Sequence, residues 1–189
     1  MRQQQGFTLI EIMIVVFVIG ISVGMVSFSI GGNSDAELTR KETEEFMLQG
    51  NYIAEQSVLK GETHGLFVVV RDATEITFDN KQGYCYQWRR VRDRQWQDLP
   101  ELQQRCLPEG MKIEFVIDDK LWEYDPELEY QDPVMGFYPS GDGSGEVEVS
   151  IYMEGKNAGD DIERIDLSIM GELVWRNEEE RIKQYKAGR

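Results

Sequence analysis

One carboxylate lies inside a long apolar stretch near the start of the chain. The stretch covers residues 7–30, and Glu11 is the one charged residue within it. A charged side chain in lipid costs on the order of a few kcal/mol, so a carboxylate there needs a cationic partner. Because the stretch itself supplies no cation, the chemistry that Glu11 offers is a buried ion pair with a positive group from elsewhere.

The stretch around Glu11 has the length of a membrane-spanning helix. At a rise of about 1.5 Å per residue, residues 7–30 form a helix of about 36 Å, and the hydrocarbon core of a bilayer is about 30 Å thick. The leader, residues 1–6, carries Arg2 and the free amine, and positive charge there predicts a cytoplasmic N-terminus. A cleaved secretory signal is the alternative, with Ser29-x-Gly31 as its cleavage site, but its apolar core is shorter, about 7 to 15 residues.

Two cysteines, Cys85 and Cys106, follow the apolar stretch. With the orientation given above they lie in an oxidising compartment, where a disulfide closes a loop of about 20 residues and is favoured over free thiols. A zinc site is a weaker interpretation, because zinc takes four nitrogen or sulfur ligands and the chain has one histidine, His64. We therefore expect a candidate disulfide at Cys85 and Cys106, no metal site and no cofactor.

The single histidine does not indicate catalysis. His64 precedes Gly65 near a predicted helix end, and neither a nucleophile nor a paired carboxylate accompanies it in the sequence. A histidine in such a setting is more often structural or exposed than catalytic. The sequence thus favours a protein that is not an enzyme.

The chain is strongly acidic, with a formal net charge of −15 at pH 7. Duplex binding needs clustered cations that neutralise phosphates, so nucleic acid is not an expected partner. One cationic cluster exists, formed by Arg89, Arg90, Arg92 and Arg94. We interpret it as a solvated face or a set of local ion pairs rather than a phosphate site.

Acidic residues gather in two regions that offer oxygen ligands for calcium. The first region contains Asp118, Asp119, Glu123, Asp125, Glu127, Glu129 and Asp132, and the second contains Asp142 and Glu146. Neither has the EF-hand spacing of acids at alternate positions with glycine at the sixth, so we interpret both as solvated loops. Trp122 and Tyr124 lie in the first region, and aromatic residues that flank strands pack in the core more often than they form a contact surface.

Secondary-structure signals predict one helix followed by strands. The helix, residues 35–60, places apolar residues on one face and is expected to continue from the membrane segment and to stop at Gly61. Strand patterns follow at residues 65–71, 74–79, 84–91, 111–117, 147–152, 162–169 and 172–176. Strands grouped after one helix predict an α+β fold with antiparallel pairing, in which the helix packs across the sheet. A polar C-terminal tail that frays is expected at residues 177–189.

The hexapeptide Gly6-Phe7-Thr8-Leu9-Ile10-Glu11 is similar to the cleavage motif of type IV prepilins and pseudopilins. The resemblance implies that a prepilin peptidase cuts between Gly6 and Phe7 and methylates the new amine of Phe7. It also implies that Glu11 is the assembly charge, paired with the N-terminal amine of a neighbouring subunit. A plain signal-anchor with an accidental glutamate is the alternative. The helix-kinking proline of many major pilins is absent, and Gly20 and Gly24 are the residues that we expect to loosen the helix there instead.

Later phrases narrow the resemblance to the H-type minor pseudopilins of the bacterial type II secretion system. They are Leu59-Lys60-Gly61 before His64-Gly65-Leu66, an aromatic strand followed by Trp96, and Phe137-Tyr138-Pro139-Ser140-Gly141-Asp142-Gly143. The residue after the Pro-Ser-Gly phrase is acidic in that family, and Asp142 keeps it, while the Gly-rich run that follows departs from the usual spacing. The resemblance implies a pilin-like fold, with a long N-terminal helix that is first transmembrane and then amphipathic.

The same resemblance implies a structural subunit at or near the tip of a short periplasmic pseudopilus, which supports export of folded proteins across the outer membrane. Its partners would be the major and other minor pseudopilins, the prepilin peptidase and an inner-membrane secretion platform. The expected organisation is a leader (1–6), a single inner-membrane helix (7–30), a periplasmic domain (31–176) and a polar tail (177–189). A minor pilin of a type IV pilus, serving motility or DNA uptake, and a membrane-anchored substrate-binding module are the alternatives.

Overall fold

The structure, a computed structural model, describes residues 9–10, 12–17, 34–71, 83–125, 127–128, 131–155 and 162–187. The chain divides into two units, Met1–Glu37 and Leu38–Arg189. In the first unit, residues 9–10 and 12–17 are helical and their apolar side chains are exposed. Within the described ranges, no helix is both long enough and apolar enough to cross a membrane.

Helix α2 (Ser34–Lys60) is the 27-residue helix that precedes the strands. Its first turn carries Asp35 and Glu37 and its last turn carries Lys60, so the charges at both ends favour the helix dipole. The helix ends at Gly61, whose φ of 64° is a left-handed conformation that glycine adopts without a Cβ clash. The predicted helix and its stop at Gly61 are confirmed.

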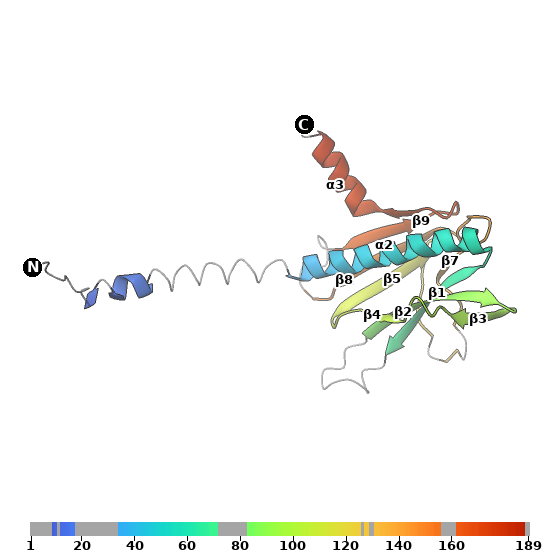
Figure 1. Cartoon of the computed structure of the whole chain (residues 1–189), viewed down its shortest axis with the longest axis horizontal. Helices are drawn as coiled ribbons and strands as arrows, with labels where there is room; N and C mark the ends of the chain where they lie inside the picture. The colour runs from blue at the N-terminus through green and yellow to red at the C-terminus, as the bar shows by residue number, and fades with distance from the viewer. Residues whose placement is uncertain are drawn as a thin grey trace, which may run out of the picture. The chain divides into compact units, whose positions relative to one another are not determined.

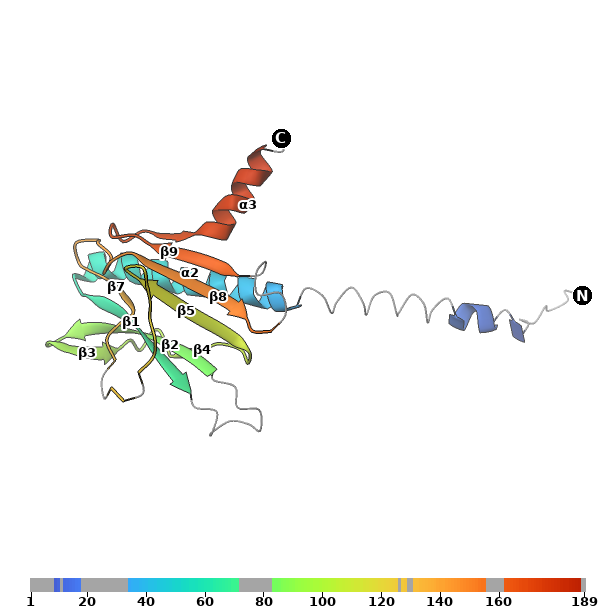
Figure 2. The ribbon, with the colours of Figure 1, turned by 180° about the vertical axis from the view of Figure 1, so that it is seen from behind.

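Two antiparallel sheets follow α2 in the chain (Figure 1, Figure 2). Sheet A has the order β3-β2-β1-β7, with β4 paired to β2. Its strands are β1 (His64–Arg71), β2 (Gly83–Arg92), β3 (Gln95–Asp98), β4 (Arg105–Cys106) and β7 (Met135–Phe137). Sheet B has the order β10-β9-β8-β5-β6. Its strands are β5 (Met111–Ile117), β6 (Lys120–Leu121), β8 (Val147–Met153), β9 (Glu163–Leu167) and β10 (Leu173–Trp175).

The hydrophobic core joins α2 to both sheets. Helix α2 contributes Phe46 and Ile53, which are almost fully buried. Strands β5 and β8 bury alternate side chains, among them Ile113 and Ile151, as their period-two sequence patterns predict. Both views show α2 lying across the strands (Figure 1, Figure 2). The α+β fold, with a long helix packed on antiparallel sheets, is confirmed.

The predicted strands agree with the structure with two qualifications. The strand expected at residues 74–79 lies outside the described residues. The short strands β3, β4, β6 and β7 have no separate prediction, because two to four residues are too few to show a period-two pattern.

The C-terminal segment differs from the predicted tail. Instead of a fraying tail at residues 177–189, the structure has helix α3 (Arg176–Ala187), with an acidic first turn and a basic last turn that favour the helix dipole. Asn177 also fastens its start, because the side-chain oxygen accepts from the Arg164 amide at 2.7 Å and the side-chain nitrogen donates to the Ile162 carbonyl at 2.9 Å. The segment is polar, as predicted, and buries no residue.

Candidate functional site

The residues of the prepilin-type motif belong to the first unit of the chain. Gly6, Phe7 and Glu11 lie outside the described residues, so their roles in cleavage, methylation and assembly stay predictions. Leu9, Ile10 and residues 12–17, which are described, form helical turns with exposed apolar side chains. An apolar surface of this kind is expected to be covered by lipid or by another protein.

Strand β4 brings the two cysteines together against β2. Cys106 is the ladder partner of Cys85, and a disulfide joins their sulfur atoms at 2.09 Å. Cys85 is buried, whereas Cys106 lies at the surface. The disulfide therefore ties the segment that follows β3 to an interior strand of sheet A.

Beside the disulfide, Arg105 forms an ion pair with helix α2. Its guanidinium donates to the Glu42 carboxylate at 2.8 and 2.9 Å and lies 4.0 Å from Glu45. The Glu42 side chain is 9% exposed, so this carboxylate is nearly buried. Arg105 is also the ladder partner of Tyr86, whose ring packs edge-on against Phe46 of α2. Helix α2 is thus bound to β4 by charge and to β2 by aromatic packing.

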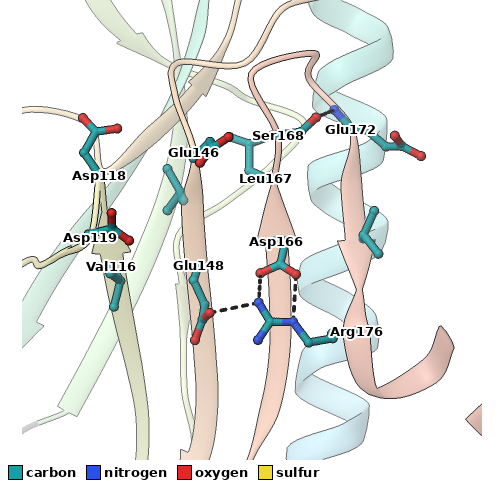
Figure 3. A pocket seen from close by; sticks show the side chains of 12 residues that line it. Val116, Asp118, Asp119, Glu146, Glu148, Asp166, Leu167, Ser168, Glu172 and Arg176 are labelled. Atoms are coloured by element: carbon teal, nitrogen blue, oxygen red, sulfur yellow. Dashed lines mark hydrogen bonds and ion pairs between the residues drawn. The ribbon is translucent and has the colours of Figure 1, made fainter. Parts of the chain in front are cut away.

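A groove of about 340 Å³ lies on sheet B (Figure 3). Four aliphatic side chains, a serine and an arginine line it together with six acidic residues: Asp118, Asp119, Glu146, Glu148, Asp166 and Glu172. Arg176 holds two of these carboxylates, with bonds of 2.9 Å to Asp166 and to Glu148 (Figure 3). Because carboxylates outnumber the single cation, the groove has a negative potential that attracts cations.

The groove combines residues from both acidic regions of the sequence. Asp118 and Asp119 come from the first region and Glu146 from the second, and the Asp118 amide donates to the Glu146 carbonyl at 3.3 Å. Other acids of the two regions do not line the groove: Glu123, Asp125, Glu127, Asp132 and Asp142. Glu129 is outside the described residues. In the described part of the chain, no group of three or more His, Cys, Asp or Glu residues could hold a metal ion.

The arginine cluster lies in β2 and in the turn that follows it. The sequence predicted either a solvated face or local ion pairs for this cluster, and its β2 members form ion pairs. Arg89 pairs with Asp98 at 2.9 Å. Arg92 and Arg90 share Glu62, at 2.9 and 3.4 Å. Arg94, the fourth member of the cluster, lies exposed in the turn after β2. Three of the four arginines thus form ion pairs, as the local-pair interpretation predicted.

His64 is a buried residue that links α2 to β1. Its Nδ1 lies 2.8 Å from the Ser57 hydroxyl, and both residues are at most 1% exposed. The Ser57 hydroxyl also lies 2.9 Å from the Ile53 carbonyl, to which it donates. In the tautomer with hydrogen on Nδ1, His64 donates to the Ser57 oxygen. Burial lowers the pKa of His64 below its ordinary value of 6.5, although hydrogen bonding and charge from Glu62 oppose the shift. The imidazole is therefore neutral at pH 7 and serves as a hydrogen-bonding link.

The aromatic residues of the first acidic region pack toward the core. Trp122 meets Phe115 edge-on with ring centroids 6.1 Å apart, and Tyr124 meets Trp122 at 6.3 Å. Phe115 is fully buried, so the core interpretation of Trp122 fits the structure better than a free contact surface.

Two buried carboxylates have no counterpart among the predicted site residues. Glu42 pairs with Arg105, and Glu163 accepts from the indole nitrogen of Trp175 at 2.8 Å. Glu42 stands four residues before Phe46 and so on the apolar face of α2, a position that could have identified it. Glu163 occupies an inward-facing position of β9, where period two places apolar residues. Their partners come from distant parts of the chain and could not be found from spacing.

Comparison with known families gives two sequence findings. The family described as the prokaryotic N-terminal methylation motif matches residues 1–27. Type II secretion system protein H of Aeromonas hydrophila is 30% identical over 125 residues, a match that covers 64% of this chain and 62% of that protein. The chain thus spans less than two thirds of that relative's length.

Two solved structures of the minor pseudopilin EpsH, from the type II secretion system of Vibrio cholerae, match this fold. One match has a TM-score of 0.55 at 17% identity and covers 74% of this chain and 93% of that one. The other has a TM-score of 0.49 at 20% identity and covers 72% and 94%. Three findings confirm the predicted resemblance: the N-terminal motif, the similarity to protein H and the fold shared in the first of these matches. The chain resembles the type IV pilin-like proteins and, among them, the H-type minor pseudopilins of type II secretion systems.

Proposed function

We propose that this chain is a minor pseudopilin of a type II secretion system, a structural subunit of the pseudopilus. The observation that carries the proposal is the methylation motif over residues 1–27, with Glu11 five residues into the chain that begins at Phe7. The pilin-like fold and the similarity to protein H support the same role.

The proposed mechanism starts with processing of the leader. A prepilin peptidase cuts between Gly6 and Phe7 and methylates the Phe7 amine. Residues 7–30 hold the subunit in the inner membrane, with the domain of residues 31–176 in the periplasm. Glu11 then pairs with the N-terminal amine of a neighbouring subunit, and at low dielectric this ion pair fixes the register of the fibre more than its stability.

The proposed position of the subunit is at or near the tip of the pseudopilus. Its partners there are the other minor pseudopilins and the major pseudopilin, and an inner-membrane platform drives assembly. The role is mechanical: the fibre supports the export of folded proteins across the outer membrane, and no catalytic step is assigned to this chain.

Substitution of Glu11 tests the proposal directly. In Glu11→Val, membrane insertion and cleavage after Gly6 should persist, because the apolar stretch and the cleavage site remain, while incorporation into fibres and secretion should be lost. Glu44→Gln, an exposed carboxylate of α2, is the matched control and should behave as wild type. Cleavage is followed by the mass shift of the leader, and incorporation by recovery of the chain in sheared fibres. Normal secretion by Glu11→Val would contradict the proposed role.

Deletion of the gene separates this proposal from its two rivals. Loss of extracellular secretion with intact motility supports the pseudopilus. Intact secretion with lost motility or DNA uptake would instead indicate a minor pilin of a type IV pilus. A direct binding assay with exported proteins distinguishes a substrate-binding module, which would bind them without entering fibres.

A further inference from the structure

The residues that follow β3 contact helix α2 at two distant positions. We call residues 99–107 the strap. Within it, Glu101 lies 3.4 Å from Lys60 in the last turn of α2, and Arg105 binds Glu42 in the first half of the helix. Leu99 and Leu107, at the ends of the strap, are 2% and 8% exposed. The strap therefore joins α2 to sheet A by its own side chains.

Backbone pairing contributes little to holding the strap in place. Its one strand is β4, two residues long, which pairs Cys106 with Cys85 and Arg105 with Tyr86. One further backbone bond follows, from the Leu107 amide to the Tyr84 carbonyl at 2.8 Å. So short a strand at a sheet edge is marginal by itself, and the Cys85–Cys106 disulfide is the covalent bond that fixes it.

Arg105, next to the disulfide, carries the positive charge that compensates Glu42 of α2. Arg105 immediately precedes Cys106, and among the described residues it is the cation within ion-pair distance of Glu42. A nearly buried carboxylate that loses its cation is left desolvated and uncompensated, which is strongly unfavourable. The cation that compensates Glu42 is thus one residue away from the disulfide in the chain.

We propose that the Cys85–Cys106 disulfide is a redox latch. When the latch is closed, it holds Arg105 against Glu42 and the strap against α2. A dithiol opens it by thiol–disulfide exchange: the bond between the two cysteine sulfurs breaks, two electrons and two protons convert them to thiols, and the dithiol becomes a disulfide. Cys106 is the exposed member of the pair and so the one that an attacking thiolate reaches.

The latch links the packing of α2 to the compartment. A reducing cytoplasm keeps both thiols free. In an oxidising compartment a partner disulfide takes two electrons and two protons from the thiols and becomes a dithiol, which closes the bond between Cys85 and Cys106. The strap consequently locks onto α2 only after the domain has left a reducing environment. The latch itself depends on the contacts of residues 42, 85, 105 and 106 and can hold or fail independently of the proposed function. Its link to the compartment rests on the proposed periplasmic location of the domain.

Limited trypsin digestion of the full chain in detergent tests the latch, because trypsin cleaves after Arg105. Reduction with dithiothreitol followed by alkylation should raise the cleavage rate after Arg105 at least about tenfold over the oxidised protein, since a loop constraint of this size is removed. Lys112 in β5 is the internal control, and cleavage after it should not rise. Mass spectrometry of the fragments measures both rates. Continued protection of Arg105 after reduction would overturn the proposal, and so would an equal rise at Lys112, which indicates global unfolding.

A charge variant gives a second, independent readout. Glu42→Gln should speed cleavage after Arg105 in the oxidised protein and should have no further effect in the reduced protein, where the strap has already left α2. Glu44→Gln, an exposed carboxylate two residues along the same helix, is the matched control and should change neither rate. An equal effect of Glu42→Gln in both redox forms would show that the disulfide does not position Arg105, and would overturn the latch.

Discussion

Helices α2 and α3 are attached to the sheets in different ways. Helix α2 buries Phe46 and Ile53 in the core. Helix α3 buries no residue, points away from the strands in both views (Figure 1, Figure 2), and is held by Arg176 and Arg181, whose side chains are each 42% exposed. Exposed ion pairs contribute about 0–1 kcal/mol each, whereas buried apolar surface contributes about 25 cal/mol per Å². The strength with which each helix is attached to the sheets therefore follows its buried apolar area and not its number of ion pairs.

The largest expected effect is on the core side of α2. Phe46→Ala removes a fully buried ring that packs against Tyr86. The free energy of unfolding should fall by about 3–5 kcal/mol, because the lost contacts leave a cavity. Urea titration followed by tryptophan fluorescence measures this loss. Leu48→Ala on the same helix is the control: Leu48 is 65% exposed, and its change should stay within about 0.5 kcal/mol. Equal losses of unfolding free energy in the two variants would contradict the claim that buried apolar area attaches α2 to the sheets.

The next effect concerns the nearly buried ion pair of α2. Arg105→Ala should lower the free energy of unfolding by about 2 kcal/mol, since Glu42 is left without its cation. Arg92→Ala is the control, because the Arg92 side chain is 52% exposed and Glu62 keeps Arg90. The same urea titration should give that control a loss of about 0.5 kcal/mol or less. A difference of the opposite sign would show that burial does not decide the strength of these pairs.

The link between α2 and β1 should depend on pH through His64. Burial holds its pKa below 6.5 in the folded chain, so the unfolded chain binds the proton first as the pH falls. The stability contributed by neutral His64 is thus complete above about pH 6.5 and declines towards the folded pKa, with a slope of at most about 1.4 kcal/mol per pH unit. Urea titrations between pH 7 and 5 measure the slope, and His64→Gln should reduce it. An unchanged slope in His64→Gln would assign the pH dependence to other groups.

The smallest effect is expected for α3. Arg181→Ala removes the ion pair with Glu163 and a cation–π contact with Trp175, whose indole nitrogen still donates to Glu163. The free energy of unfolding should fall by about 0.5–1 kcal/mol, because the Arg181 side chain is 42% exposed and the buried Glu163 keeps its hydrogen bond from Trp175. Far-UV circular dichroism should show a loss of helix no larger than the 12 residues of α3. A loss of stability as large as that of Arg105→Ala would contradict the claim that α3 is attached more weakly than α2.

The sequence predicted the elements whose patterns repeat over enough residues. Helix α2 and the long strands β1, β2, β5 and β8 follow from period and from turn residues such as Gly61. The shortest strands could not be found in this way: β4, two residues long, exists because Cys106 and Arg105 meet β2 and α2. Helix α3 was also missed, because it buries no residue and so shows no apolar face with a helical period. The carboxylates that attach it precede Arg176 by 10 to 28 residues.

The candidate functional residues also fall into two classes: those that neighbouring positions in the sequence reveal and those that only the fold brings together. The prepilin-type motif is contiguous, so residues 6–11 indicate the chemistry without a fold. The groove on sheet B gathers residues from four separate parts of the chain, and only strand order places them together (Figure 3).

The sequence by itself determined the apolar stretch with its single Glu11, the long helix, the antiparallel strand pattern and the pilin-like resemblance, because each depends on local period or on adjacent residues. Tertiary structure alone decided that Glu42 meets Arg105, that Glu163 meets Trp175 and that the acidic regions share a groove. A buried carboxylate is stable only where a hydrogen-bond donor or a cation lies against it. For Glu42 and Glu163 these partners are far away in the sequence, and only the packing of the helix and sheets brings them close.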